Sequence, residues 1–205
     1  MKVIAINGSP EKEGNTYTVL KMMADTLISE GIEVEIIQVG DQLIHGCIGC
    51  GYCRKCENNL CVFNDDITNE VSLKMRAADG IILGSPTYYG GIAGAMKCFL
   101  DRVFYSGTKY FLGKVGTAVA VARRAGAIEA ANALSSYLRL SQVILTPSQY
   151  WLALYGAENG EVNQDLEGMQ TAKKTALAMA WLLKRKNDDL PEGMREQKIF
   201  TNFIR

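Results

Sequence analysis

The sequence contains a single histidine, His45, among its 205 residues. Hydrolases of the Ser-His-Asp or Cys-His type need an imidazole base beside their nucleophile. No such arrangement can be assembled around His45, and the Cys-x5-Arg loop of phosphatases is also missing. We therefore predict that His45 is a loop residue and that the chain does not work through a side-chain nucleophile.

The chain also lacks an excess of charge and any long apolar run. Lysine plus arginine equals aspartate plus glutamate at 22 each, so no net field attracts nucleic acid or an anionic membrane. No apolar run approaches the roughly 20 residues that a bilayer-spanning helix needs, and the start of the chain does not read as a leader. We expect a cytoplasmic protein with neither nucleic acid nor membrane as a partner.

The first motif joins an apolar run to a helical pattern. Residues 3–6 are apolar, Gly8-Ser9-Pro10 has turn chemistry, and helical periodicity begins at Gly14-Asn15-Thr16. In such a strand-loop-helix unit, loop N–H groups and the helix N-terminus, with roughly +0.5 of partial charge, form a phosphate site. Side-chain donors on the same rim come from Ser9, Asn15 and Thr16.

The spacing of this loop is neither that of a Walker A motif nor that of the dinucleotide fingerprint Gly-x-Gly-x-x-Gly. Asn15 follows Gly14 where a Walker A loop has lysine, so a phosphate monoester fits better than a nucleoside triphosphate. Taken alone, the segment is equally compatible with a turn that only joins a strand to a helix cap.

Periodicity along the rest of the chain predicts strands that alternate with helices. The expected strands cover residues 3–6, 32–39, 81–83, 115–122 and 142–145, and the expected helices cover 16–30, 66–78, 93–104, 128–140 and 165–184. Residues 147–164 are expected to be irregular. This pattern predicts one α/β domain, a doubly wound parallel sheet with helices on both faces.

Ligands of such sheets bind outside the carboxyl ends of the strands, where the strand order reverses. Three loops there follow Ile6, Leu83 and Ala122. The second loop, residues 84–91, offers tyrosine faces and free backbone amides, which suit a flat heteroaromatic ring beside the phosphate. Flavin mononucleotide (FMN) has that shape.

Five of the six cysteines lie close together, and the first four recur at every third position. Ligands of one zinc ion usually come from two pairs further apart in sequence, whereas Cys-x-x-Cys-x-x-Cys can bind one face of a [4Fe-4S] cluster. The triplet is Cys47, Cys50 and Cys53, and the fourth ligand is either Cys61, beyond a polar bend, or Cys56. Reduced thiols that only pack the loop, or a dithiol pair, are the alternatives.

Together these motifs resemble the iron-sulfur flavoproteins, a group of NAD(P)H-dependent FMN reductases with the flavodoxin-like fold. The motifs that carry the resemblance are Gly-Ser-Pro-x-x-x-Gly-Asn-Thr at 8–16, the cysteine run with Cys-Val-Phe-Asn-Asp-Asp at 61–66, Gly-Ser-Pro-Thr-Tyr-Tyr at 84–89, Met-Lys-Cys-Phe-Leu-Asp-Arg at 96–102 and Tyr150-Trp151. The resemblance covers nearly the whole chain. It implies a five-stranded parallel sheet of order 2-1-3-4-5.

The resemblance also implies the site residues. It places the FMN phosphate on Ser9, Asn15 and Thr16, with Pro10, Lys12 and Arg124 as further contacts, and the ring against Pro86, Thr87, Tyr88, Tyr89 and Gly90. It implies a [4Fe-4S] cluster on Cys47, Cys50, Cys53 and Cys61. Two departures stand out: acidic Glu11 and Glu13 flank Lys12 where relatives commonly have basic residues, and Cys56 is an extra thiol.

The organisation implied by the resemblance is an FMN-binding domain over residues 1–186, with a cysteine-rich loop at 44–64 and a tail at 187–205. It also implies homo-oligomers, dimer or tetramer, with Phe200, Phe203 and Ile204 of the tail available to dock on a neighbour.

The function implied is an FMN-dependent oxidoreductase that passes electrons between a donor, ferredoxin or NAD(P)H, and a small acceptor. A flavin needs no side-chain nucleophile, which agrees with the missing triad. The alternatives are an NAD(P)H-dependent FMN or quinone reductase whose cysteines are structural, and a flavin-binding sensor.

Overall fold

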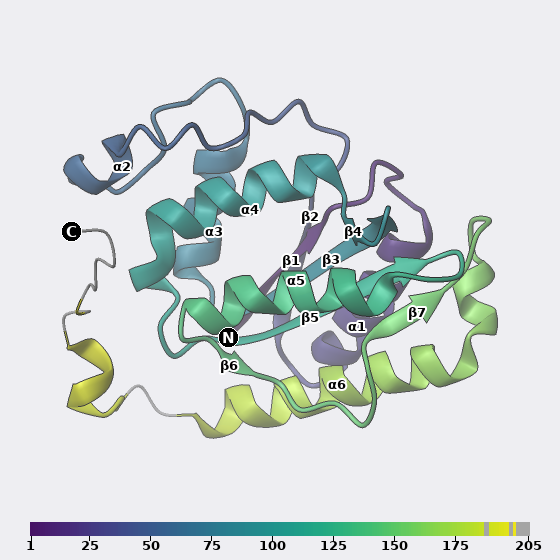
Figure 1. Cartoon of the computed structure of the whole chain (residues 1–205). Helices are drawn as coiled ribbons and strands as arrows, with labels where there is room; N and C mark the ends of the chain where they lie inside the picture. Colours follow the sequence, from purple (N-terminus) through teal and green to yellow (C-terminus); the bar gives the residue numbers. More distant parts are fainter. Residues whose placement is uncertain (187–188, 197–198, 200–205) are drawn as a thin grey trace.

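The computed structural model describes residues 1–186, 189–196 and 199, which form a central sheet with helices on both faces (Figure 1). The strands are β1 (Lys2–Asn7), β2 (Glu33–Gln38), β3 (Gly80–Tyr88), β4 (Gly91–Ile92), β5 (Val115–Ala122), β6 (Ile144–Leu145) and β7 (Ala153–Tyr155). The α-helices are α1 (Asn15–Ser29), α2 (Tyr52–Lys55), α3 (Thr68–Ala77), α4 (Gly94–Gly107), α5 (Ala127–Leu140) and α6 (Leu166–Arg185).

The strand order β2-β1-β3-β5-β6 confirms the predicted doubly wound sheet and its order 2-1-3-4-5. These strands are parallel, and β1 lies between β2 and β3, with Ile4 opposite Glu35 of β2 and Ile81 of β3. The apolar runs of β1, β3 and β5 are buried because helices cover both faces. Their carboxyl ends therefore meet along one edge of the sheet.

Two strands differ from the expectation, and the sheet has seven strands where five were predicted. The fifth position is divided: β6 pairs with the start of β5 and β7 with its end. The prediction of an irregular segment at 147–164 was thus wrong for β7. Three residues are too short to show alternation, and β7 forms because β6 pairs only with the start of β5, so the rest of that β5 edge supplies hydrogen bonds, such as Ala120 N–H to Leu152 O at 3.0 Å.

The third strand is also longer than the predicted 81–83. β3 runs on through Pro86, which lies opposite Val121 of β5, and then pairs antiparallel with β4. Only Tyr89 and Gly90 turn the chain, with φ of 50° and 73°. The predicted loop at 84–91 is therefore mostly strand, because β5, eight residues long, offers it a pairing partner.

Helices cover both faces of the sheet (Figure 1), and each face carries its own apolar layer. On one face α1 and α6 bury Leu20, Met23 and Met179, and on the other α3, α4 and α5 bury residues such as Phe99 and Leu134. Within the part of the chain that the structure describes, no helix is long and apolar enough to cross a membrane. The predicted docking residues Phe200, Phe203 and Ile204 lie outside the described residues.

Candidate functional site

The loop between β1 and α1 is held by side chains at its own base. Asn7, the last residue of β1, accepts a hydrogen bond from the Ser9 N–H (3.1 Å) and donates one to Gln38 Oε1 (2.6 Å). Gln38 in turn donates to the Ser9 carbonyl oxygen (2.6 Å), and Ser9 Oγ accepts from the Glu11 N–H (3.1 Å). The loop therefore has a defined shape without any ligand.

The N-terminus of α1 is open. Gly14 is its N-cap and has no side chain that could accept a hydrogen bond. Among the described residues, the N–H groups of Asn15, Thr16 and Tyr17 have no acceptor. Unpaired amides at the positive end of a helix favour an anion, so this loop suits a phosphate group.

Two glycines let the loop pack closely against its neighbours. A Cβ on Gly40, just after β2, would lie 2.2 Å from the Ser9 carbonyl oxygen. A Cβ on Gly8 would lie 2.7 Å from the Met96 side chain on α4. A side chain at either position would therefore force the loop or its neighbour to move.

Asn15 and Lys12, both predicted to contact the phosphate, have other partners in the structure. The Asn15 amide donates to the Glu158 carbonyl (2.9 Å) and accepts from the Gly160 N–H (2.9 Å), which leaves its backbone N–H for a ligand. Lys12 is exposed and pairs with Asp41 at 3.4 Å. Pro10 is also exposed.

The second and third predicted loops touch each other beside this site. Gly126, the N-cap of α5, has φ of 85°, and a Cβ there would lie 2.9 Å from Gly90 Cα and 3.1 Å from Thr87 Cγ2. The Thr87 hydroxyl is buried and has no hydrogen-bond partner among the described residues, as expected for a polar group that a ligand completes. Tyr88 and Tyr89 are exposed.

Arg124, in the third loop, is exposed. It makes no hydrogen bond or ion pair with another described residue. Its cation is therefore free to meet a negative charge on a ligand.

The cysteine-rich loop, residues 44–64, contains only the short helix α2 and runs along the top of the molecule in Figure 1. Four of its thiols, those of Cys47, Cys50, Cys53 and Cys61, line one cavity. The fifth thiol, that of Cys56, does not line this cavity and donates to the Leu60 carbonyl oxygen (3.5 Å). The structure therefore brings together the four predicted ligands and separates them from the extra thiol.

Within residues 1–186, 189–196 and 199, no group of three or more His, Cys, Asp or Glu side chains is placed to hold a metal ion. A [4Fe-4S] cluster sets a different requirement, because each thiolate binds a different iron atom. Its ligands surround a volume and do not converge on one point. Four thiols around one cavity fit that donor set, with two of them exposed (Cys47 and Cys50), Cys53 buried and Cys61 half-buried.

Side chains of α3 hold the second half of this loop. Asn69 accepts from the Cys61 N–H (2.9 Å) and donates to the carbonyl oxygens of Cys61 (2.9 Å) and Phe63 (3.0 Å). Arg76 donates to the carbonyl oxygens of residues 58 and 59 (2.7 and 2.6 Å). A segment with little regular structure thus receives its shape from a neighbouring helix.

Arg102 on α4 is the main charged group at the cavity, and the sequence motifs did not assign it a role. Its Nε donates to Cys61 Sγ (3.2 Å), its Nη2 donates to the Phe63 carbonyl (3.0 Å), and its Nη1 pairs with Asp66. The side chain is fully buried. In the sequence, Arg102 could have been singled out because it is a charged residue on the apolar face of a predicted helix, the face that also contains Phe99.

Burial and charge change the pKa values around the cavity. Burial, followed by the charges of the neighbouring thiols, raises the pKa of Cys53. Burial disfavours the charge of Arg102, but hydrogen bonds to Asp66 and Cys61 raise its pKa above the usual value. Burial opposes ionisation of Asp66 as well, and hydrogen bonds from Arg102 and Thr68 nevertheless keep its pKa low. The Arg102–Asp66 pair therefore stays ionised.

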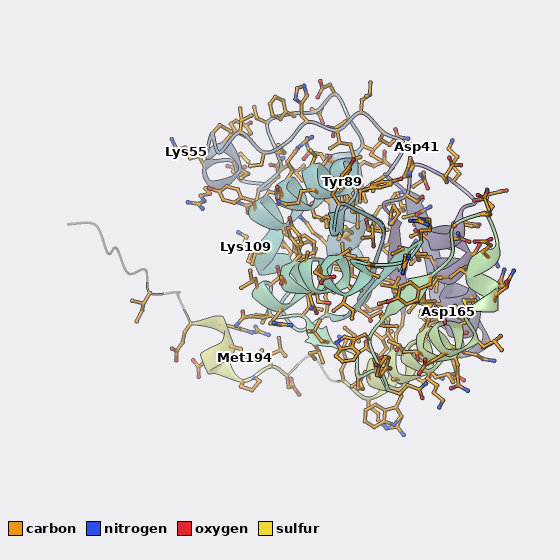
Figure 2. All side chains as sticks on the ribbon, turned by 45° about the vertical axis from the view of Figure 1, so that its right-hand side comes forward. Asp41, Lys55, Tyr89, Lys109, Asp165 and Met194 are labelled. Carbon is orange, nitrogen blue, oxygen red and sulfur yellow. The ribbon has the colours of Figure 1, made fainter. Side chains whose placement is uncertain are left out.

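The two regions lie on one side of the molecule. Figure 2 shows Asp41, beside the phosphate loop, and Lys55, in α2, along the upper edge, with Tyr89 between them in that view. His45 lies in the intervening loop and stacks on Phe63 with ring centroids 4.8 Å apart. It is a loop residue, as predicted.

Comparisons with known proteins agree with this geometry. Residues 1–157 match the family model of the NADPH-dependent FMN reductases. The chain is 35% identical to the iron-sulfur flavoprotein MJ1083 of Methanocaldococcus jannaschii over 192 residues, 90% of this chain and 98% of the relative. It is 29% identical to an iron-sulfur flavoprotein of Methanosarcina thermophila over 195 residues, 92% of this chain and all of the relative.

Among solved structures, RosB with bound 8-demethyl-8-formylriboflavin-5'-phosphate has the same fold, with a TM-score of 0.70 at 18% identity, covering 90% of this chain and 79% of RosB. The match to a flavin reductase model over most of the chain shows the family. The chain therefore belongs to the NADPH-dependent FMN reductase family, among the flavin-dependent oxidoreductases called iron-sulfur flavoproteins.

Proposed function

We propose that the protein passes electrons between a donor, ferredoxin or NAD(P)H, and a small acceptor through FMN and a [4Fe-4S] cluster. The observation that carries this proposal is the single cavity lined by Cys47, Cys50, Cys53 and Cys61, with Cys56 outside it. A cluster transfers single electrons and a flavin transfers one or two, so the pair would link one-electron and two-electron partners.

The chain's own groups would bind and orient the flavin. In this proposal the N–H groups of Asn15, Thr16 and Tyr17 and the hydroxyl of Ser9 bind the phosphate, which the helix N-terminus favours. The ring lies against residues 86–90, where the buried Thr87 hydroxyl lacks a partner. Pro10, Lys12 and Arg124 remain predicted contacts at the rim.

The rim of the cysteine cavity would be the place where an electron donor approaches. Cys47 and Cys50 are exposed, and the exposed apolar side chains of Ile48, Tyr52 and Val62 lie in the same loop. Weak redox encounters use small surfaces of this kind, because the partner must leave after each transfer.

A homo-oligomer, dimer or tetramer, and a cytoplasmic location complete the proposal, and both rest on the family resemblance. Light scattering of the purified protein at several concentrations would test the oligomer. A mass that stays at that of one chain would contradict it.

Anaerobic purification followed by iron, sulfide and FMN analysis tests the proposed function. We expect about four iron atoms, four sulfides and one FMN per chain. Cys61→Ser should lose most of the iron, whereas Cys56→Ser, the matched control, should keep it. Both should retain FMN, because the flavin site uses none of these thiols. Wild-type protein that contains flavin but no iron would contradict the electron-carrier version.

One alternative has support of its own. The matching family model is that of NADPH-dependent FMN reductases. An FMN-only NAD(P)H-dependent flavin or quinone reductase with structural cysteines would oxidise NADPH rapidly and accept electrons from ferredoxin slowly. Stopped-flow reduction of the flavin by each donor separates the two functions.

A further inference from the structure

We propose that Arg102 is a positioning residue for the cluster: its guanidinium holds the Cys61 sulfur as the fourth ligand and stabilises the reduced cluster. This inference rests on the proposed function, because it assigns a role toward the same four thiols. It concerns a residue of α4, more than 40 positions away in sequence from the ligand that it contacts.

The geometry leaves the guanidinium little freedom. Its side chain is 0% exposed, and its two terminal nitrogens are occupied by Asp66 and the Phe63 carbonyl oxygen. Nη1 also donates to the His45 carbonyl oxygen (3.3 Å). Because the planar group is held at its far end, the direction of the Nε–H is set, and it points to Cys61 Sγ at 3.2 Å.

Cys61 is held by side chains of two helices outside the loop, whereas Cys56 makes its hydrogen bonds within its own turn, to residues 52, 59 and 60. Asn69 binds both the N–H and the carbonyl oxygen of Cys61, and Arg102 binds its sulfur. The Cys56 sulfur instead donates to a carbonyl in its own turn. The pre-organised thiol at the cavity is thus Cys61, which gives a physical reason for its selection as a ligand.

Charge gives the second part of the inference. A cluster with four thiolate ligands becomes more negative when it accepts an electron, and hydrogen bonds to its sulfurs favour that state. Asp66 offsets part of the Arg102 charge. Arg102→Gln therefore makes the surroundings one unit more negative and should lower the midpoint potential, whereas Asp66→Asn makes them one unit more positive and should raise it.

A matched control variant distinguishes an effect of Arg102 on the cluster from mere support of the loop. Arg76 is a half-buried arginine that donates to carbonyl oxygens of the same loop, at residues 58 and 59, and it lies over the Tyr110 ring at 4.3 Å. It contacts none of the four thiols at the cavity. If Arg102 only supported the loop, substitution of either arginine would have the same consequences.

The experiment compares the wild type with Arg102→Gln, Arg102→Lys, Asp66→Asn and Arg76→Gln, each purified anaerobically with FMN bound. Iron per chain is measured before and after dialysis against a chelator, and the cluster potential is measured by redox titration with electron paramagnetic resonance. For Arg102→Gln we expect severalfold greater iron loss and at least a tenfold weaker one-electron reduction equilibrium, which corresponds to about −59 mV. Arg102→Lys should lower the potential less than Arg102→Gln does. Asp66→Asn should raise the potential, and Arg76→Gln should leave it unchanged.

The outcomes separate this inference from the proposed function. Wild-type protein without iron would overturn both. An iron-loaded wild type whose Arg102 and Asp66 variants keep its potential would overturn this inference alone, as would an equal shift in Arg76→Gln. If Arg102→Gln does not fold, as judged by FMN content, opposite shifts in Arg102→Lys and Asp66→Asn still support the inference, and unchanged potentials overturn it.

Discussion

The phosphate loop, residues 8–16, and the cysteine loop, residues 44–64, obtain their shapes in different ways. The phosphate loop is short, lies between β1 and α1, and is held by its own neighbours, such as Asn7 and Gln38. The cysteine loop has four helical residues of its own and is held by side chains from α3 and α4, namely Asn69, Arg76 and Arg102.

This difference teaches which substitutions each region tolerates. The phosphate loop would bind its ligand through backbone N–H groups, so its function depends on the path of the backbone more than on its side chains. The cysteine loop would bind through side chains, and a few buried hydrogen bonds fix where these point. We therefore expect the cysteine loop to be sensitive at its anchors and the phosphate loop to be sensitive at its glycines.

Asn69→Ala should have the largest effect. It removes three hydrogen bonds from a buried amide and leaves the N–H and the carbonyl oxygen of Cys61 without partners, whereas the Phe63 carbonyl oxygen still accepts from Arg102. We expect the free energy of unfolding to fall by about 3 kcal/mol, measured by urea denaturation. Asn58→Ala is the control, because the Asn58 side chain accepts an exposed bond from the Leu60 N–H while the bond from Arg76 goes to the backbone carbonyl oxygen, and the substitution should cost less than about 0.5 kcal/mol. Equal losses in the two variants would show that α3 does not anchor the loop.

Gly40→Ala should come next and should act on the phosphate loop. Its Cβ would lie 2.2 Å from the Ser9 carbonyl oxygen, so the backbone of the loop must move. Overpacking of this kind costs about 1–3 kcal/mol, and we expect FMN affinity to fall by roughly tenfold or more in a fluorescence titration. Gly94→Ala is the control, because a Cβ there meets no atom within 4 Å. FMN binding that is unchanged in Gly40→Ala would mean that the shape of this loop does not determine phosphate binding.

The main sheet could be predicted because its signals are local. The apolar run at 3–6 and the helical spacing after Thr16 each lie within one segment, and their alternation fixes the class of fold. The extension of β3 to Tyr88 and the strand β7 could not be predicted in this way. Both form on β5, a partner distant in sequence, and their own residues read as turn or irregular chain.

The candidate site, like the fold, could be predicted from the sequence only in part. The spacing of the cysteines indicated a cluster site but did not decide between Cys56 and Cys61, because the choice depends on hydrogen bonds from Asn69 and Arg102. Asn15 was read as a phosphate donor from its neighbours in sequence. Its side chain instead binds residues 158 and 160, and only the folded chain shows this.

Asn15→Ala tests whether the Asn15 side chain serves to hold residues 158 and 160, and its effect should be smaller than that of Gly40→Ala. It removes the hydrogen bonds to the Glu158 carbonyl and the Gly160 N–H, so we expect a loss of about 1–2 kcal/mol in urea denaturation. FMN affinity should fall less than in Gly40→Ala, because the backbone N–H remains. Asn163→Ala, which loses one exposed bond to the Gly160 carbonyl, is the control. A larger loss of FMN affinity than of stability would assign the side chain to the phosphate.

Thr87→Val should have the smallest effect and would sharpen the comparison at the ring. The buried Thr87 hydroxyl has no partner among the described residues, so its replacement by a methyl group should leave the flavin-free protein equally stable or more stable. If bound FMN supplies the missing partner, the variant should bind FMN about fivefold more weakly, which corresponds to roughly 1 kcal/mol. The two effects have opposite signs, so thermal unfolding with and without FMN separates them. Unchanged FMN affinity would show that the hydroxyl is not completed by the flavin, and the backbone would then carry the ring site as it carries the phosphate site.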